Sequence, residues 1–260
     1  MTGIVRPKLF GAALACLLLQ TAHAADVCQG TVAAAVATHA GIERKDGAGT
    51  VVASACRLWP YDGKTLLSAI VFSTHDADVK NLVVAMVDAK SGRVVGSYER
   101  EVGEDAAVQF GENSLSIDTA PYQLAQDVRA FGVRFRSAAH GASCADGAWE
   151  DELTLFVRRA DSLAPVLRGL PMSRWEAVKG CLGQSEGLVF DEARLSLGLA
   201  RTSSHGFADL IVTARIRRES AADDTVGKPK TEQTTLRYDG NAYQSGKNPP
   251  WWLSFFPLGD

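Results

Sequence analysis

Short runs in which apolar and polar residues alternate are the feature that most constrains how this chain folds. The clearest run covers residues 210–217, where Leu210, Val212, Ala214 and Ile216 alternate with mostly polar residues. A period of two places every second side chain on the same face of an extended strand. The run therefore predicts a β-strand with one buried face and one face in water.

The same pattern recurs along most of the chain. We expect further strands over residues 51–59, 65–73, 82–88, 93–100, 115–117, 131–135, 153–157, 164–167, 193–199 and 235–238. Gly92 ends a short loop, and Asp239-Gly240-Asn241 is typical of a β-hairpin. Residues 33–40 fit a short helix, and residues 172–178 fit either a helix or a strand. About ten strands with frequent turns and no long amphipathic helix predict an antiparallel all-β fold.

Three hairpins, at residues 82–98, 153–167 and 210–243, share one layout of strand, turn and return strand. Recurrence of one unit favours a propeller-like or two-lobed β array. The Gly-rich segment 180–187 is then the expected boundary between two lobes. The alternative is one ordinary antiparallel fold, because the three hairpins share a pattern but no residues.

The N-terminal residues 1–24 have the features of a secretory signal peptide. Arg6 and Lys8 precede the apolar residues 9–19, and Ala22-His23-Ala24 is a small-x-small cleavage site. The mature β domain would then cover residues 25–260, and no later apolar run is long enough to span a bilayer. Ala13-Leu14-Ala15-Cys16 offers an alternative, a lipoprotein anchored through Cys16. Both alternatives predict an exported protein, periplasmic or secreted in the first case.

The cysteines fit an oxidising compartment. Four of the five, Cys28, Cys56, Cys144 and Cys181, lie beyond either cleavage site. An even number in an exported chain predicts two disulfides, and four cysteines allow three pairings. Sequence order favours Cys28 with Cys56 and Cys144 with Cys181, since each pair encloses a loop-like stretch. Their spacing matches no zinc pattern.

The charge balance argues against nucleic acid as a partner. Removal of residues 1–24 takes away Arg6 and Lys8 and no acid, which leaves 27 − 2 = 25 basic against 30 acidic residues, a net charge of −5. Neutralising phosphates requires clustered, excess Lys and Arg. We therefore expect no nucleic-acid binding.

Few residues suggest a reaction. The chain has no G-x-S-x-G nucleophile motif, and the mature cysteines are assigned to disulfides. His75 lies beside Asp76 and Asp78, but such a group in a polar loop is more often solvated surface than a metal or general-base site. A carboxylate-based glycan hydrolase, which would use Asp151, Glu152 or Asp191, is the remaining enzymatic alternative. We predict no catalytic residue, no metal and no cofactor.

Two short stretches resemble known families. Residues 206–212, Gly-Phe-Ala-Asp-Leu-Ile-Val, resemble the second half of an FG-GAP, integrin-type repeat, whose calcium ligands precede and follow the glycine. The preceding ligand positions fall on Arg201, Ser203 and His205, and only Asp209 keeps a ligand type, so the resemblance implies a lost calcium site. This strand and residues 236–240 are also similar to exported bacterial β proteins related to periplasmic lysozyme inhibitors and immunity proteins. That resemblance implies function by binding.

Two groups of residues are candidates for a binding surface. Arg215 and Arg217 lie on the polar face of the predicted strand, and Trp251 and Trp252 belong to the most aromatic stretch of the chain. For the two tryptophans, closure of the core is favoured over a place on a binding surface, because buried aromatic side chains contribute strongly to stability. We expect an exported binding or inhibitor-like protein that acts by protein–protein contact. An envelope structural or assembly factor is the first alternative, and the glycan hydrolase is the second.

Overall fold

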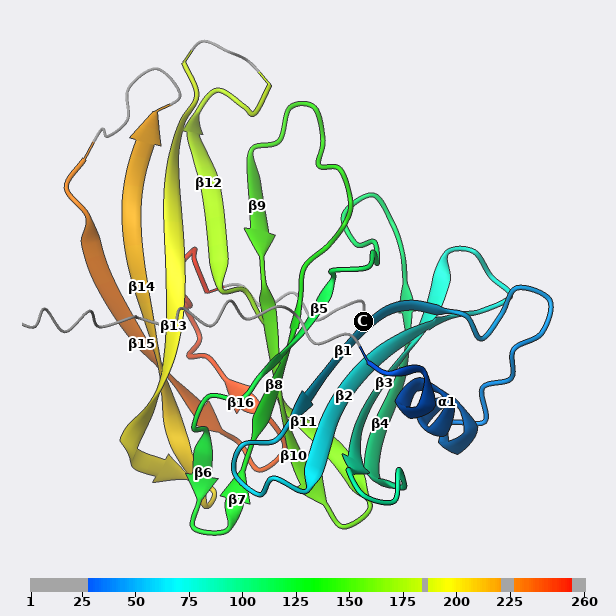
Figure 1. Ribbon diagram of the computed structural model, residues 1–260. Coiled ribbons are helices and arrows are strands. Elements are labelled where there is room, and N and C mark those ends of the chain that lie inside the picture. Colours follow the sequence, from blue (N-terminus) through cyan, green and yellow to red (C-terminus); the bar gives the residue numbers. More distant parts are fainter. Residues whose placement is uncertain (1–27, 184–186, 221–226, 254–260) are drawn as a thin grey trace, which may run out of the picture.

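A computed structural model of the protein describes residues 28–183, 187–220 and 227–253 (Figure 1). It contains sixteen β-strands and one helix within these ranges, which confirms the predicted all-β fold. The proposed signal peptide and Cys16 lie outside the described residues. None of the helical structure in the described ranges is long and apolar enough to cross a bilayer.

The first sheet curls into a nearly closed barrel. Its eight strands follow the order β1 (Val51–Leu58), β2 (Thr65–Ser73), β3 (Val79–Asp88), β4 (Val94–Gly103), β11 (Ser162–Leu170), β10 (Glu152–Arg159), β8 (Phe131–Phe135) and β5 (Leu115–Asp118). The two edge strands, β1 and β5, contact each other and bring the ends of the sheet together. All neighbours are antiparallel except β4 and β11, which are parallel and pair only at Ser97 and Ser162.

The second sheet is open and has six strands. Their order is β16 (Tyr243–Gln244), β15 (Lys230–Tyr238), β14 (Phe207–Ser220), β13 (Val189–Ser204), β12 (Ser173–Lys179) and β9 (Gly147–Glu150). The strands β6 (Gln123–Ala125) and β7 (Val128–Arg129) form a separate two-stranded hairpin, which packs against β14 and β10. Residues 180–187 connect β12 and β13, which are paired neighbours in one sheet. The segment therefore lies between two strands of one sheet, and the lobe boundary near it stays a prediction.

Apolar side chains form three clusters that hold these parts together. One fills the barrel interior, one lies between the barrel and the second sheet, and one lies under α1 (Gly30–His39). Strand β10 contributes side chains to the first two clusters, since Phe156 faces the barrel interior while Leu153 and Leu155 pack towards the second sheet. A strand covered on both faces reads as a continuous apolar run, as residues 153–157 do.

Residues 210–217 form part of a strand with one buried face, as their alternation predicts. Leu210, Val212, Ala214 and Ile216 are buried on the inner face of β14. They belong to the cluster between the sheets, which also contains Trp252, only 1% exposed. Burial at this scale makes the aromatic residue part of the fold's core rather than of its surface.

The structure contains two disulfides, and both have the pairing that sequence order favours. Cys28–Cys56 ties the segment before α1 to β1, and Cys144–Cys181 ties the loop between β8 and β9 to the connection after β12. Their Cα atoms are 4.9 and 5.0 Å apart. Two disulfides fit an oxidising compartment outside the cytoplasm.

Candidate ligand pocket

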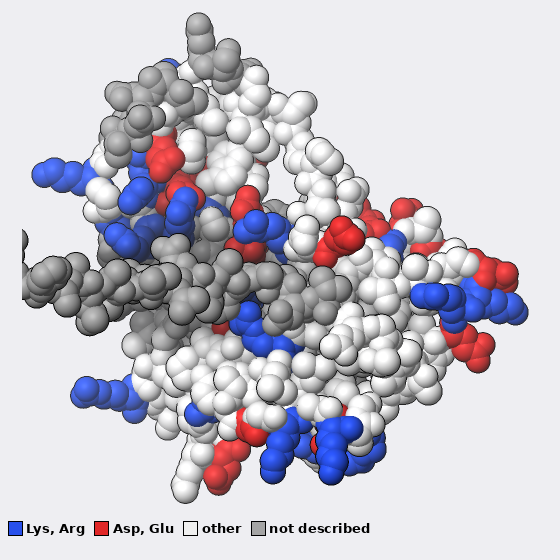
Figure 2. All heavy atoms as spheres, in the orientation of Figure 1, with Lys and Arg blue, Asp and Glu red and all other residues white. Residues whose placement is uncertain are grey.

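The four residues predicted to form a binding surface do not lie together. Arg215 and Arg217 are exposed on the outer face of β14. Trp252 is buried against the inner face, where its Nε1 donates a hydrogen bond to Glu232 Oε2 at 2.7 Å, and Trp251 packs against the same core. The prediction that Trp252 lies on a binding surface is therefore wrong, and this residue closes the core instead. On the face drawn in Figure 2, basic and acidic side chains are interspersed and form no large patch of one sign.

Two of the three acids considered for glycan hydrolysis are held by arginines. Asp191 accepts two hydrogen bonds from Arg218, both at 2.8 Å, and these bonds hold the pKa of Asp191 below its usual value. Asp151 accepts two from Arg136, at 3.2 and 3.1 Å. Asp191 lies at the β13–β14 pair and does not line the cavity that Asp151 and Glu152 share. The structure therefore does not bring Asp191 together with the other two acids.

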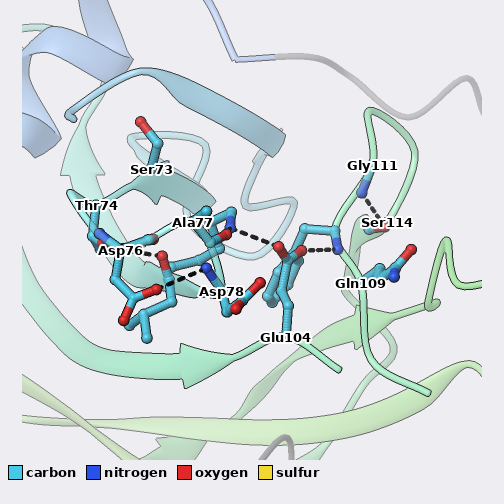
Figure 3. Close-up of polar contacts among 12 residues, drawn as sticks. Ser73, Thr74, Asp76, Ala77, Asp78, Glu104, Gln109, Gly111 and Ser114 are labelled. Carbon is cyan, nitrogen blue, oxygen red and sulfur yellow. Dashed lines mark hydrogen bonds and ion pairs between the residues drawn. The ribbon is translucent and has the colours of Figure 1, made fainter. Parts of the chain in front are cut away.

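The loop that contains His75 is a hydrogen-bonded turn (Figure 3). Asp76 Oδ1 accepts from the backbone N–H of Asp78 at 3.0 Å, and Thr74 Oγ1 accepts from the N–H of Asp76 at 3.1 Å. Within the described ranges, no group of three or more His, Cys, Asp or Glu side chains is placed to hold a metal ion. Asp76 thus serves the conformation of the loop.

Residues 203–209, which resemble part of a calcium-binding repeat, form a tight hairpin between β13 and β14. Ser204 pairs with Phe207, and the two residues between them, His205 and Gly206, both have positive φ angles of 47° and 85°. Such values are typical of a type I′ turn. Asp209 Oδ2 accepts a hydrogen bond from the Thr202 hydroxyl at 2.7 Å. Asp209 therefore supports this hairpin.

A cavity of about 670 Å³, here called the loop pocket, lies where the end of the barrel meets β9 and β12. Its walls include Phe135 from β8, Trp149 from β9, Glu152 from β10 and Trp175 from β12, together with parts of loops 106–108 and 136–146. Its volume is within the range of small-molecule sites, which are typically apolar with a few convergent polar groups. Trp175 is held edge-on against Phe190, with ring centroids 5.7 Å apart.

Glu152 is the unusual polar group in this wall. The residue is only 3% exposed, and Trp149 Nε1 donates a hydrogen bond to its Oε1 at 2.5 Å. Its Oε2 has no hydrogen-bond partner among the residues that the structure describes. Burial disfavours the charged carboxylate and raises the pKa of Glu152 to about 7, although the bond from Trp149 opposes this shift. An unpaired oxygen this deeply buried is costly, and in native proteins it calls for an explanation.

The loop 136–146 covers the pocket and is fixed at several points. Cys144 bonds to Cys181, Leu182 N–H donates to Ala145 O at 2.9 Å, and Ala177 N–H donates to Asp146 O at 2.7 Å. These contacts attach the loop to β12 and the connection that follows it. The cover is therefore held to the second sheet by one covalent bond and two hydrogen bonds.

The loop after β4 forms another side of the pocket and is held by an ion pair (Figure 3). Lys80 Nζ lies 2.6 Å from Glu104 Oε2, and Glu104 Oε1 accepts from the N–H of Phe110 at 2.5 Å. The N–H of Gln109 donates to Ser137 Oγ at 3.0 Å, which joins this loop to the covering loop. The two loops at the barrel end thus support each other.

Sequence reasoning found the acids of this pocket but missed its tryptophans. Asp151 and Glu152 drew attention as a carboxylate cluster, whereas Trp149 and Trp175 lie in short strands whose alternation is weak. The available signal was a tryptophan beside a run of three acids, residues 149–152. Nothing in the sequence indicated that β12 would bring a second tryptophan to the same place.

Comparison with protein-family models, with curated proteins and with solved structures finds no match to this chain. The case for function therefore depends on the pocket itself.

Proposed function

We propose that the protein is an exported binding protein that recognises its partner by contact at the loop pocket and catalyses no reaction. The observation that carries this proposal is the cavity of about 670 Å³ with two tryptophans and one buried acid in its walls. Concave, aromatic sites with few polar groups are the usual form of a recognition site. A pocket braced by a disulfide and linked loops is also pre-organised, which lowers the entropic cost of binding.

The glycan hydrolase alternative receives less support from the same residues. Hydrolysis of this kind needs two carboxyl groups that face each other across the substrate. Asp151 is engaged by Arg136, and Asp191 is engaged by Arg218 away from the pocket. Among the three acids considered, only Glu152 has a raised pKa suited to a general acid.

Two matched leucines allow a direct test. Leu182 lines the pocket and is 49% exposed, whereas Leu199 on β13 is 36% exposed and is not part of the pocket wall. Wild-type protein and the variants Leu182→Ser and Leu199→Ser are immobilised and exposed to a bacterial envelope extract, and retained proteins are quantified. We expect a partner that wild type and Leu199→Ser retain and Leu182→Ser loses.

Two outcomes would contradict the proposal. One is that no protein is retained above the level of an unrelated bait, or that the Leu182→Ser variant retains it as well as wild type does. The other is cleavage of peptidoglycan by the purified protein that disappears in Glu152→Gln, which would favour the hydrolase.

A further inference from the structure

The loop pocket contains an uncompensated acid, and this suggests the chemistry of its ligand. Glu152 Oε2 is buried and has no partner among the described residues, while Oε1 is used by Trp149. We propose that the pocket selects a lysine side chain of the partner protein, whose ammonium group becomes the counter-ion of Glu152. This inference deepens the proposed function and rests on it.

The charges around the pocket favour a cation. Its wall contains four carboxylates, on Asp146, Glu150, Asp151 and Glu152, against one guanidinium, on Arg136, and one imidazole, on His140. Arg136 is already paired with Asp151 at 3.1 Å, so it does not neutralise Glu152. An anionic ligand would meet like charge, and a neutral ligand would leave the excess negative charge uncompensated.

The aromatic wall supports the same choice. Trp149 and Trp175 both line the cavity together with Phe135. The faces of aromatic rings, those of tryptophan above all, attract cations that have left water. The alkyl stem of a lysine would at the same time contact apolar groups of the wall, such as Val108 and Leu182.

The geometry of Glu152 favours lysine over arginine. A guanidinium binds a carboxylate best through two parallel hydrogen bonds, which require both oxygens. Only Oε2 is unused here, because Trp149 donates to Oε1. An ammonium group is a compact charge on a flexible four-carbon stem, so it can pair with a single carboxylate oxygen.

The inference is tested with Nα-acetyl-lysine methylamide as the probe and the norleucine analogue, which has the same alkyl stem without the charge, as its neutral counterpart. Binding at millimolar concentrations is followed by tryptophan fluorescence and by the indole N–H signal of Trp149. We expect the lysine probe to bind and the norleucine probe to bind at least about tenfold more weakly, as loss of a buried charge pair implies. If wild type binds neither probe, or binds both equally, the inference is wrong.

Two glutamates provide the variant and its control. Glu152→Gln keeps an oxygen for Trp149 but removes the charge, and Glu232→Gln makes the same change at a second glutamate that accepts from a tryptophan, Trp252, away from the pocket. We expect roughly tenfold weaker binding of the lysine probe by Glu152→Gln and no change for Glu232→Gln. Equal weakening by both would contradict the assignment. If Glu152→Gln fails to fold, the comparison of the lysine and norleucine probes on wild type still tests the lysine assignment.

The same variants separate this inference from the proposed function. A partner captured by wild type is acetylated on its lysines and tested again with each bait. Loss of binding after acetylation and in Glu152→Gln, with retention by Glu232→Gln, agrees with the lysine assignment. A partner that binds at the loop pocket regardless of acetylation and of the Glu152 substitution would leave the proposed function intact and overturn the lysine assignment. Absence of any partner would instead remove the proposed function.

Discussion

Two segments outside the sheets are each held by a disulfide, one to the barrel and the other to the second sheet, and they cover very different spaces. Cys28–Cys56 holds α1 over β2 and β3, where Val36 is completely buried in an apolar cluster. Cys144–Cys181 holds the loop 136–146 over the loop pocket, a cavity of about 670 Å³. One covered face is filled with side chains, and the other is hollow.

The difference follows from what each segment can place on the sheet. A helix satisfies its own backbone hydrogen bonds and can direct apolar side chains such as Val36 inward. The loop consists largely of Ala, Gly and Ser between Arg136 and Gly147, so it has no large apolar side chains with which to fill the space beneath it. A covalent tie can therefore replace packing as the means of holding a cover in place.

The largest expected effect comes from breaking the two ties separately. The sequence separations of 28 and 37 residues correspond to about 4 kcal/mol of stabilisation for each disulfide in the loop-entropy model. We expect Cys28→Ser with Cys56→Ser to lower the unfolding free energy by about that amount. The pair Cys144→Ser with Cys181→Ser should cost clearly less, because the freed loop regains freedom in the folded state. Urea denaturation compares the two, and equal losses would contradict the contrast.

The next effect is a dependence of stability on pH, and it is expected at Glu152 in the wall of the loop pocket. The pKa of Glu152 is raised from 4.5 to about 7 in the folded protein, so folding favours its protonated form. Its contribution to stability is fully present below pH 4.5 and is lost as the pH rises through 7. Relative to Glu152→Gln, which does not titrate, wild type should lose on the order of 3 kcal/mol across this window. Urea denaturation of both proteins at several pH values measures the difference, and a constant difference would argue against the raised pKa.

Truncating one side chain near each cover should have a smaller effect on stability, and the effect should differ between the two covers. Val36→Ala should lower the unfolding free energy by about 2 kcal/mol, because it opens a void in a filled cluster. Leu182→Ala, at a residue that is half exposed beside the pocket, should change it by no more than about 0.5 kcal/mol. Thermal unfolding of both variants tests this order, and the reverse order would mean that the pocket wall is part of the core.

The smallest effect on stability is expected from filling part of the loop pocket. Ala139 lines the pocket, and Ala139→Leu should raise the unfolding free energy by about 0.5–1 kcal/mol while weakening binding of the lysine probe. Ala138→Leu is the control, because Ala138 is exposed and is not in the pocket wall. If both variants bind the probe as wild type does, the space beneath the loop is not the binding site.

Local pattern was sufficient for most of the fold. The strand at residues 210–217 was predictable because the alternation of apolar and polar residues marks a half-buried strand. The strand at residues 65–73 was predictable as a mostly apolar run, and it is buried on both faces. The strand β9 has four residues and is too short to show a period. The sequence of residues 172–178 fits a helix or a strand equally well, and pairing with β13 makes most of this segment the strand β12. The disulfide pairing could be anticipated because each pair is close in sequence.

The pocket could not be predicted in the same way. Its wall combines Val108, Phe135, Trp149, Trp175 and Leu182, which come from five separate segments. Which of them meet depends on the curl of the first sheet and on the pairing of β9 with β12. Trp252 was a candidate both for a binding surface and for core closure, and it is buried in the core.

The parallel contact between β4 and β11 has a consequence for the order in which the barrel assembles. Strands β1 to β4 are successive antiparallel neighbours, so residues 51–103 can form their contacts from within one short stretch of chain. The other half of the sheet joins these strands through β11, which begins at Ser162 and pairs with β4 at one residue pair. We expect amides of the first four strands to gain protection early in refolding and those of β11 to gain it late. Pulse-labelling hydrogen exchange would detect the reverse order, which would mean that the β4–β11 junction forms before the four strands that it joins to the rest of the sheet.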